Sequence, residues 1–176
     1  MINLRQVAFL SAVVLFLSAL SVLMNPEQSM GQQRGPVFSS WEGFEADKCA
    51  SIWLIKRFIN KNAIFRFYPK GEVAMEGTAF DTPDAKFRRY HNMSTFESIL
   101  KHYNLQDPAL VHIGRIMHDI EVNIWEQKIM PETVRVQNEI NRIILNHEDR
   151  GETIEKSCRY FDALYREVAA RCKESQ

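Results

Sequence analysis

The sequence predicts a predominantly α-helical α+β fold, in one compact domain with a small β element, behind an apolar N-terminal segment. The first observation is an uncharged run at residues 7–23, which separates the N-terminus from the rest. The second is the three-and-four spacing of apolar residues in most stretches after residue 47. The third is that short alternating stretches, typical of strands, fall between residues 63 and 90.

Composition is that of an ordinary globular protein, with 45% hydrophobic and 25% charged residues in 176. The 22 basic side chains are matched by 22 acidic ones, so we expect no nucleic-acid partner, because binding phosphates needs an excess of Lys and Arg. No glycine-rich phosphate-binding loop occurs, so we expect no nucleotide cofactor. Three cysteines are too few for a disulfide framework.

The N-terminal 24 residues have the layout of a secretory signal, with a basic start, the apolar run at 7–23 and a polar exit after Asn25-Pro26. About 17 apolar residues also reach the lower limit for spanning a bilayer. We therefore predict either a cleaved signal peptide or an uncleaved membrane anchor at residues 1–24. Residues 25–40, rich in Gln, Ser, Gly and Pro, read as a linker.

The first elements of the domain are expected between residues 47 and 90. Residues 47–59 (DKCASIWLIKRFI) form a helix that is apolar on nearly every side, which predicts a central, buried helix. Residues 63–68 (AIFRFY) alternate as a strand, and residues 77–80 (GTAF) read as a second extended piece. Residues 87–90 are a candidate third strand.

Four helices are expected after this β element. The first opens at Ser94 and runs through residue 103, and the second opens at Asp107-Pro108 and runs to about residue 122. The third runs from Pro131-Glu132 to about residue 146, and Gly151 separates it from the last helix. Cys49 lies inside the predicted central helix and is expected to be an inert core thiol.

The densest group of potential ligands is the run His118-Asp119-Ile120-Glu121 near the end of the second of these helices. Imidazole and carboxylate together suit divalent metals such as Mn, Fe or Zn. His118 and Glu121 lie three residues apart and can point into one cleft beside Gly114, whereas Asp119 points elsewhere. The structural alternative is a solvated helix end.

Three further candidates each have a simpler explanation. Glu97 completes a capping box with Ser94, in which each side chain binds the other's backbone N–H. Asp47 can be the N-cap of the central helix. His91 lies in a loop or at a strand end, where a lone histidine is usually a surface residue.

Five motifs in a fixed order, from about Trp41 to Tyr165, are similar to the chromate-resistance family, the C-terminal domain of ChrB-type proteins, also described as chromate resistance exported proteins. We assign residues 41–172 to such a domain. The resemblance implies a role in resistance to, or sensing of, chromate or related oxidative metal stress. The five motifs are DKCASIWLIKRFINKNAIFRFYPKGEV, AFDTPDAKF, STFESIL, LQDPALVHIGRIMHDIEV and YFDALY.

The resemblance also implies which polar residues form a site. Two positions at which family members often carry histidine hold Glu45 and Arg89 here, and His91 could replace the second only by a two-residue shift. The family's recurrent polar positions fall on Asp47, Asp81, Glu97, His118, Asp119 and, as an acidic residue, Glu121.

Two functional hypotheses follow. The first is an exported protein, periplasmic or anchored to the inner membrane through residues 7–23, that binds a divalent metal (Mn, Fe or Zn) or a small oxyanion. The second is a metal-dependent enzyme: either a Mn or Fe redox enzyme or a phosphohydrolase using His91, His118-Asp119 and a later aspartate, Asp149 or Asp162. The expected metal ligands are Asp47, His91, Glu97, His118, Asp119 and Glu121.

Overall fold

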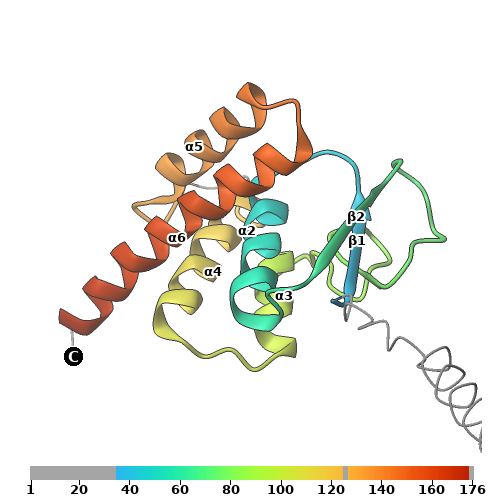
Figure 1. Cartoon of the computed structure of the whole chain (residues 1–176). Coiled ribbons are helices and arrows are strands. Elements are labelled where there is room, and N and C mark those ends of the chain that lie inside the picture. The colour runs from blue at the N-terminus through green and yellow to red at the C-terminus, as the bar shows by residue number, and fades with distance from the viewer. Residues whose placement is uncertain (1–34, 125–126, 175–176) are drawn as a thin grey trace, which may run out of the picture. The chain divides into compact units, whose positions relative to one another are not determined.

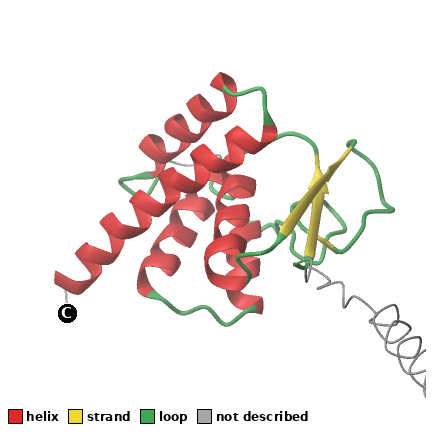
Figure 2. Ribbon diagram, viewed as in Figure 1, coloured by secondary structure: helices red, strands yellow, loops and turns green. Residues whose placement is uncertain are grey.

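The structure is a computed structural model that describes residues 35–124 and 127–174, and it confirms the predominantly helical α+β class (Figures 1 and 2). The helices gather on one side and the small sheet stands on the other. In chain order the elements are β1 (Val37–Trp41), α2 (Ala46–Leu54), the π-helical turn η1 (Ile55–Ile59), β2 (Ile64–Tyr68), β3 (Thr78–Ala79), α3 (Thr95–His102), α4 (Pro108–Glu121), α5 (Thr133–Asn146) and α6 (Arg150–Glu174).

The sheet is entirely parallel, with strand order β2-β1-β3. The helical segment α2–η1 connects β1 to β2, because parallel neighbours need a crossover connection. β1 starts inside the segment 25–40 that the sequence assigned to a linker. Its two serines, Ser39 and Ser40, are fully buried, so polar residues that suggested a linker belong to the interior of the folded unit.

Two expected boundaries differ from the structure. The predicted strand at residues 87–90 is wrong: this segment makes only isolated bridges, between Phe80 and Phe87 and between Tyr90 and Met93. The last helix begins before Gly151, because the carboxylate of Asp149 accepts a hydrogen bond from the backbone N–H of Glu152 at 2.9 Å and so caps α6.

Helix α2 is the centre of the fold, as its apolar sequence predicted. Every residue from Ala46 to Leu54 is buried, and the helix contacts α3, α4, α5 and α6. Its Trp53 ring stacks on those of Phe96 and Phe161. A buried helix apolar on all sides can pack against elements in every direction, which explains this position.

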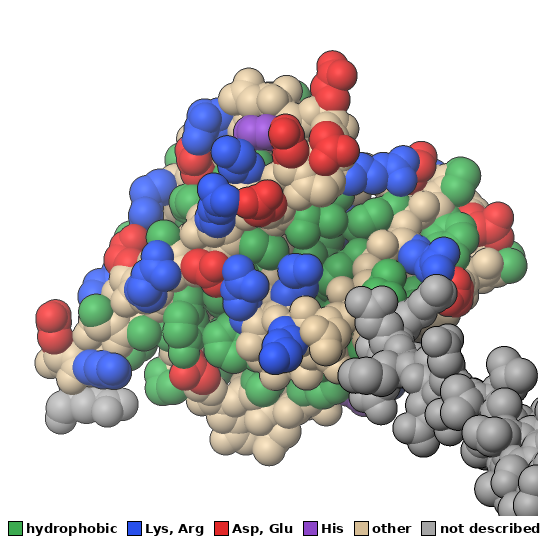
Figure 3. Space-filling model, viewed as in Figure 1, with side chains coloured by type: hydrophobic (Ala, Val, Ile, Leu, Met, Phe, Trp, Pro, Cys, Tyr) green, Lys and Arg blue, Asp and Glu red, His purple; other side chains and the backbone are tan. Residues whose placement is uncertain are grey.

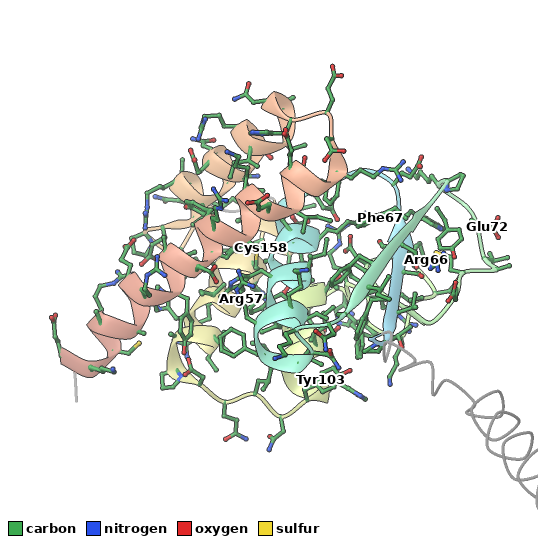
Figure 4. The ribbon with its side chains drawn as sticks, in the orientation of Figure 1. Arg57, Arg66, Phe67, Glu72, Tyr103 and Cys158 are labelled. Carbon is green, nitrogen blue, oxygen red and sulfur yellow. The ribbon has the colours of Figure 1, made fainter. Side chains whose placement is uncertain are left out.

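The chain continues from α2 into the π-turn η1, which is tied to α6 through one carboxylate. Arg57 donates two hydrogen bonds to Asp162, at 2.9 and 2.8 Å, and Trp53 Nε1 donates to the same carboxylate at 2.8 Å. Figure 4 shows Arg57 beside Cys158, where this part of the chain meets α6. Asp162 thus joins two elements that are far apart in the sequence.

Helices α3 and α4 approach closely at Gly114. A Cβ atom at this position would lie 3.2 Å from Leu100 Cδ1 and 3.5 Å from Glu97 Cγ. The missing side chain leaves room for α3, so Glu97 comes within reach of the α4 residue one turn further on, His118.

The outer helices α5 and α6 carry interspersed charges of both signs, visible on the face drawn in Figure 3. Arg135 of α5 pairs with Glu167 of α6 at 2.9 Å, and Glu132 binds Arg171 at 2.5 Å. These pairs link the two helices at their surface.

All three cysteines are free. Cys49 and Cys158 are buried, and burial raises the pKa of the Cys49 thiol to about 12 and that of Cys158 to about 11. Cys49 is therefore the inert core thiol that its position predicted.

The apolar run at residues 7–23 lies outside the described residues. Within the part of the chain that the structure describes, no helix has both the length and the apolar character needed to cross a membrane.

Candidate functional site

The start of α3 is held by a carboxylate from another helix. Asp47, buried in the first turn of α2, accepts hydrogen bonds from the backbone N–H groups of Thr95 at 2.6 Å and Phe96 at 2.9 Å. The sequence suggested that Asp47 caps its own helix, but the N-cap of α2 is Glu45, whose side chain makes no capping hydrogen bond. Asp47 caps α3 instead.

Asp81 approaches the same turn of α3 from the segment after β3. Its Oδ1 accepts a hydrogen bond from Thr95 Oγ1 at 2.9 Å, and only 7% of the side chain is exposed. The other oxygen, Oδ2, is buried and accepts no hydrogen bond of standard geometry from the described residues, although the carboxyl of Glu45 lies within hydrogen-bonding reach of Asp81 and raises its pKa. The nearest cation, Lys48 Nζ, lies 3.5 Å away and donates to the carbonyls of Trp41 and Gly43.

Glu121, the last residue of α4, brings a third carboxylate to this region. Its side chain is 10% exposed and pairs with Arg89 at 2.7 Å. The backbone N–H of Asp47, at the start of α2, lies close enough to lower the pKa of this carboxyl. We call the group Glu45, Asp47, Asp81 and Glu121 the carboxylate cluster.

The pKa values of the cluster report crowded negative charge. Burial raises the pKa of Asp47 well above its ordinary value, and the charges of Asp81 and Glu121 raise it further. Burial raises the pKa of Asp81 to about 7, with Glu45 adding to the shift and Lys48 opposing it. Burial and Glu45 also raise the pKa of Glu121, against the ion pair with arginine. Four carboxylates face two cations, so the cluster favours uptake of protons or of a cation.

Glu97 of α3 and His118 of α4 form a pair. Glu97 makes the predicted capping box with Ser94, with bonds of 2.8 and 3.2 Å. The same carboxylate lies 3.0 Å from His118 Nδ1. Glu97 therefore makes the predicted capping contact and also contacts His118, another of the expected ligands. His118 and Glu121, expected to share a cleft, contact different partners.

Asp119 points away from this site, as the helical spacing indicated. It accepts hydrogen bonds from Thr133 Oγ1 at 2.6 Å and from the backbone N–H groups of Ile129 and Met130. Burial favours its neutral form, but these bonds and one from Asn123 outweigh burial and hold the pKa of Asp119 below its ordinary value. Its contacts secure the connection between α4 and α5.

His91 is exposed in the turn between Tyr90 and Met93, and it makes no contact with the other candidates in the described part of the chain. The phosphohydrolase pattern would need this histidine together with His118-Asp119 and a later aspartate. Asp162 is bound by Arg57 and Trp53, and Asp149 caps α6. The structure therefore gives each of these residues a separate position and does not assemble that pattern.

As the side chains stand, residues 35–124 and 127–174 contain no three carboxylate, imidazole or thiol groups arranged to hold a metal ion. The cluster's oxygens engage backbone N–H groups, Lys48 and Arg89. A metal ion at the carboxylate cluster would therefore replace one of these two cationic side chains. The buried Oδ2 of Asp81, which accepts no hydrogen bond of standard geometry from the described residues, is the atom best placed to receive it.

Four residues of this site were absent from the expected ligands: Glu45, Asp81, Lys48 and Arg89. Asp81 was named through the family resemblance alone, because a DTPD turn looks like any surface turn. Glu45 and Arg89 stand where family members often have histidine. The charge of Glu45 raises the pKa of Glu121 and the charge of Arg89 lowers it, so both positions act on the carboxylate cluster.

Comparison with known protein families identifies the family of the chain. The family model described as the ChrB, C-terminal domain, matches residues 38–168. This chain belongs to the ChrB C-terminal domain family. The matched range starts within β1 and includes every residue of the carboxylate cluster. The protein is thus of the chromate-resistance type.

A curated relative supports the same family. Protein ChrB of Cupriavidus metallidurans (strain ATCC 43123 / DSM 2839 / NBRC 102507 / CH34) is 25% identical over 120 residues. The aligned region covers 61% of this chain and 37% of that protein, so the chain spans little more than a third of its relative. No solved structure matches the chain.

Proposed function

We propose that this ChrB-type domain binds a divalent cation at the carboxylate cluster. The observation that carries the proposal is Asp81 Oδ2, a buried carboxylate oxygen that accepts no hydrogen bond of standard geometry from the described residues. It lies in a group where four carboxylates are opposed by only Lys48 and Arg89. A divalent cation would supply the missing positive charge.

The ligand chemistry favours a hard cation. The cluster offers carboxylate oxygens and no imidazole or thiolate, and such oxygens suit Mn²⁺ better than Zn²⁺. Of the expected metals Mn, Fe and Zn, we therefore favour Mn²⁺. Glu45 in place of the histidine frequent in the family makes the site richer in oxygen.

The charge of the cluster also decides between a cation and an oxyanion. A chromate-like dianion brought to this cluster would face four carboxylates, and like charges repel one another more strongly where water is excluded. The alternative that this cluster binds an oxyanion therefore has no support.

Arg89 and Lys48 act as internal competitors in this proposal. Arg89 occupies one side of Glu121, with its own side chain half exposed, so it can swing into solvent at low cost. Lys48 is almost fully buried and is held by two backbone carbonyls. We therefore expect the metal to displace Arg89 and to leave Lys48 in place.

Two variants with opposite effects test the proposal. Mn²⁺ binding to the purified protein is measured by calorimetry and by the shift in thermal unfolding temperature. Asp81→Asn should abolish binding, while Arg89→Gln should tighten it, because the competing charge is removed. Arg66→Gln, which breaks an exposed ion pair with Glu76, is the matched control. Equal Mn²⁺ affinity in all four proteins would refute the site.

We further propose that the apolar run at residues 7–23 directs the domain out of the cytoplasm, as a cleaved signal or as an anchor in the inner membrane. The support is the charge pattern of the first 40 residues: a basic start, an uncharged run and a polar exit. The carboxylate cluster would then sample the metals of the periplasm.

A further inference from the structure

A surface hollow of about 650 Å³ lies between one side of α3 and the segment that follows Asp81. Its size is within the range of small-molecule sites. It contains no residue of the carboxylate cluster. Its walls are formed mainly by Lys86, Phe87, Tyr90, Met93, Lys101 and His102.

The charged side chains of this hollow are all basic. Lys86, Lys101 and His102 line it, and no acidic residue does. Lys101 makes no ion pair within the described part of the chain, and Lys86 Nζ lies only over the Phe87 ring, 5.3 Å from its centroid. The two lysines therefore place positive charge here without an ion-pair partner among the described residues, which is the electrostatic setting for an anion.

The remaining walls are apolar and aromatic. Phe87 is fully buried behind the hollow, and the His102 ring meets it edge-on with centroids 5.1 Å apart. Tyr90 is partly exposed at the rim, where the guanidinium of Arg88 lies 4.8 Å from its ring centroid. A flat apolar group could contact the Tyr90 ring and Met93, which line the hollow, while a charged group meets the lysines.

We propose that this hollow binds a small organic anion, with a phosphate-type dianion near Lys86, Lys101 and His102 and a flat apolar body against Tyr90 and Met93. The volume exceeds what a single inorganic oxyanion fills, so such an ion at the lysines would leave the apolar side chains of the hollow without a contact. The inference does not depend on the proposed function, since the two sites share no residue.

Phenyl phosphate is a probe with both required parts. Its binding to the purified protein is followed by NMR chemical-shift changes, alongside inorganic phosphate, which lacks the ring, and benzyl alcohol, which lacks the charge. We expect saturable binding of phenyl phosphate, at least about tenfold tighter than that of inorganic phosphate, and no saturation by benzyl alcohol. Equal affinity for phenyl phosphate and inorganic phosphate would overturn the assignment of an organic ligand.

Single substitutions locate the binding. Lys101→Ala and Lys86→Ala should each weaken phenyl phosphate binding by about tenfold, the effect of one charge-assisted hydrogen bond. Lys70→Ala removes another exposed lysine, outside the hollow, and should leave phenyl phosphate affinity unchanged. All three side chains are exposed, so unchanged thermal unfolding shows that the variants are folded. Unchanged affinity in both hollow variants would overturn the proposal, whatever the outcome of the Mn²⁺ experiment.

Discussion

The backbone N–H of Phe96 lies 2.9 Å from Asp47 Oδ1, so a carboxylate of α2 caps the first turn of α3. A cap supplied from outside the helix couples the positions of α2 and α3. The same carboxylate stands in the cluster that we propose as a cation site. Capping and ligand binding therefore use one side chain.

Asp47→Ala should lower the free energy of unfolding by about 3 kcal/mol, because two buried backbone N–H groups lose their acceptor. Asp47→Asn keeps one acceptor oxygen and should lose less. Urea unfolding followed by circular dichroism measures both. Ser94→Ala removes the cap within α3 itself and should cost about 1 kcal/mol. An Asp47→Ala loss no larger than that of Ser94→Ala would argue against this account.

The metal-free protein should lose stability between about pH 4 and pH 7 through Asp81. The folded protein holds this proton more tightly than the unfolded chain, since the pKa is about 7 when folded and ordinarily 3.8. The contribution is therefore fully present below about pH 4 and is lost as the pH rises through 7. Asp81→Asn has no titratable group at this position. The thermal unfolding temperature of this variant should therefore fall less than that of the wild-type protein between pH 4 and pH 7.

The turn at Asp81 makes asparagine a suitable replacement. Asp81 has a φ of +54°, in the left-handed region that asparagine also tolerates. A parallel pH dependence in the wild-type protein and Asp81→Asn would show that another group is responsible.

Asp119→Ala should destabilise the protein by about 3 kcal/mol without changing Mn²⁺ affinity. The substitution leaves the N–H groups of Ile129 and Met130 and the hydroxyl of Thr133 without their acceptor. Glu139→Ala, which removes an exposed ion pair with Arg142, provides the control and should cost less than about 1 kcal/mol. Loss of metal binding in a folded Asp119→Ala protein would return Asp119 to the site.

Thiol labelling under native conditions should modify Cys172 and spare the other two cysteines. Cys172 is partly exposed, whereas Cys49 and Cys158 are buried with raised pKa values. Thermal unfolding with and without a reducing agent should agree, because all three thiols are free. A large drop on reduction would indicate a disulfide that involves Cys49.

Residues 1–40 fused to a reporter that is active only outside the cytoplasm should give an active fusion. The uncharged run at residues 7–23 is the reason for this expectation. Release of the reporter in soluble form would indicate cleavage, and retention in the membrane fraction would indicate an anchor. A well-expressed but inactive fusion would contradict export.

Local sequence was sufficient where local physics decides the structure. The capping box at Ser94 and Glu97 was predicted correctly, and so was the buried, central position of α2. β1 was missed because Ser39 and Ser40, although buried, carry no apolar signal. The strand forms through pairing with β2, a partner later in the chain.

The candidate site depended on distant parts of the sequence. Asp47, Asp81 and Glu121 come from three separate segments, and no spacing rule relates them. Each taken alone resembles a helix cap, a turn or a solvated helix end. Only the fold brings them to the N-termini of α2 and α3, where their shared burial and charge become visible.

The strand order has a consequence for how the domain is made. β1 comes first in the chain but lies in the middle of the sheet, between β2 and β3. During synthesis or transport from the N-terminus, one edge of β1 can pair as soon as β2 has followed, but its other edge stays unpaired until the segment through Ala79 has followed. Until β3 arrives, β1 therefore exposes one strand edge that a chaperone could bind, and that a neighbouring nascent chain could pair with.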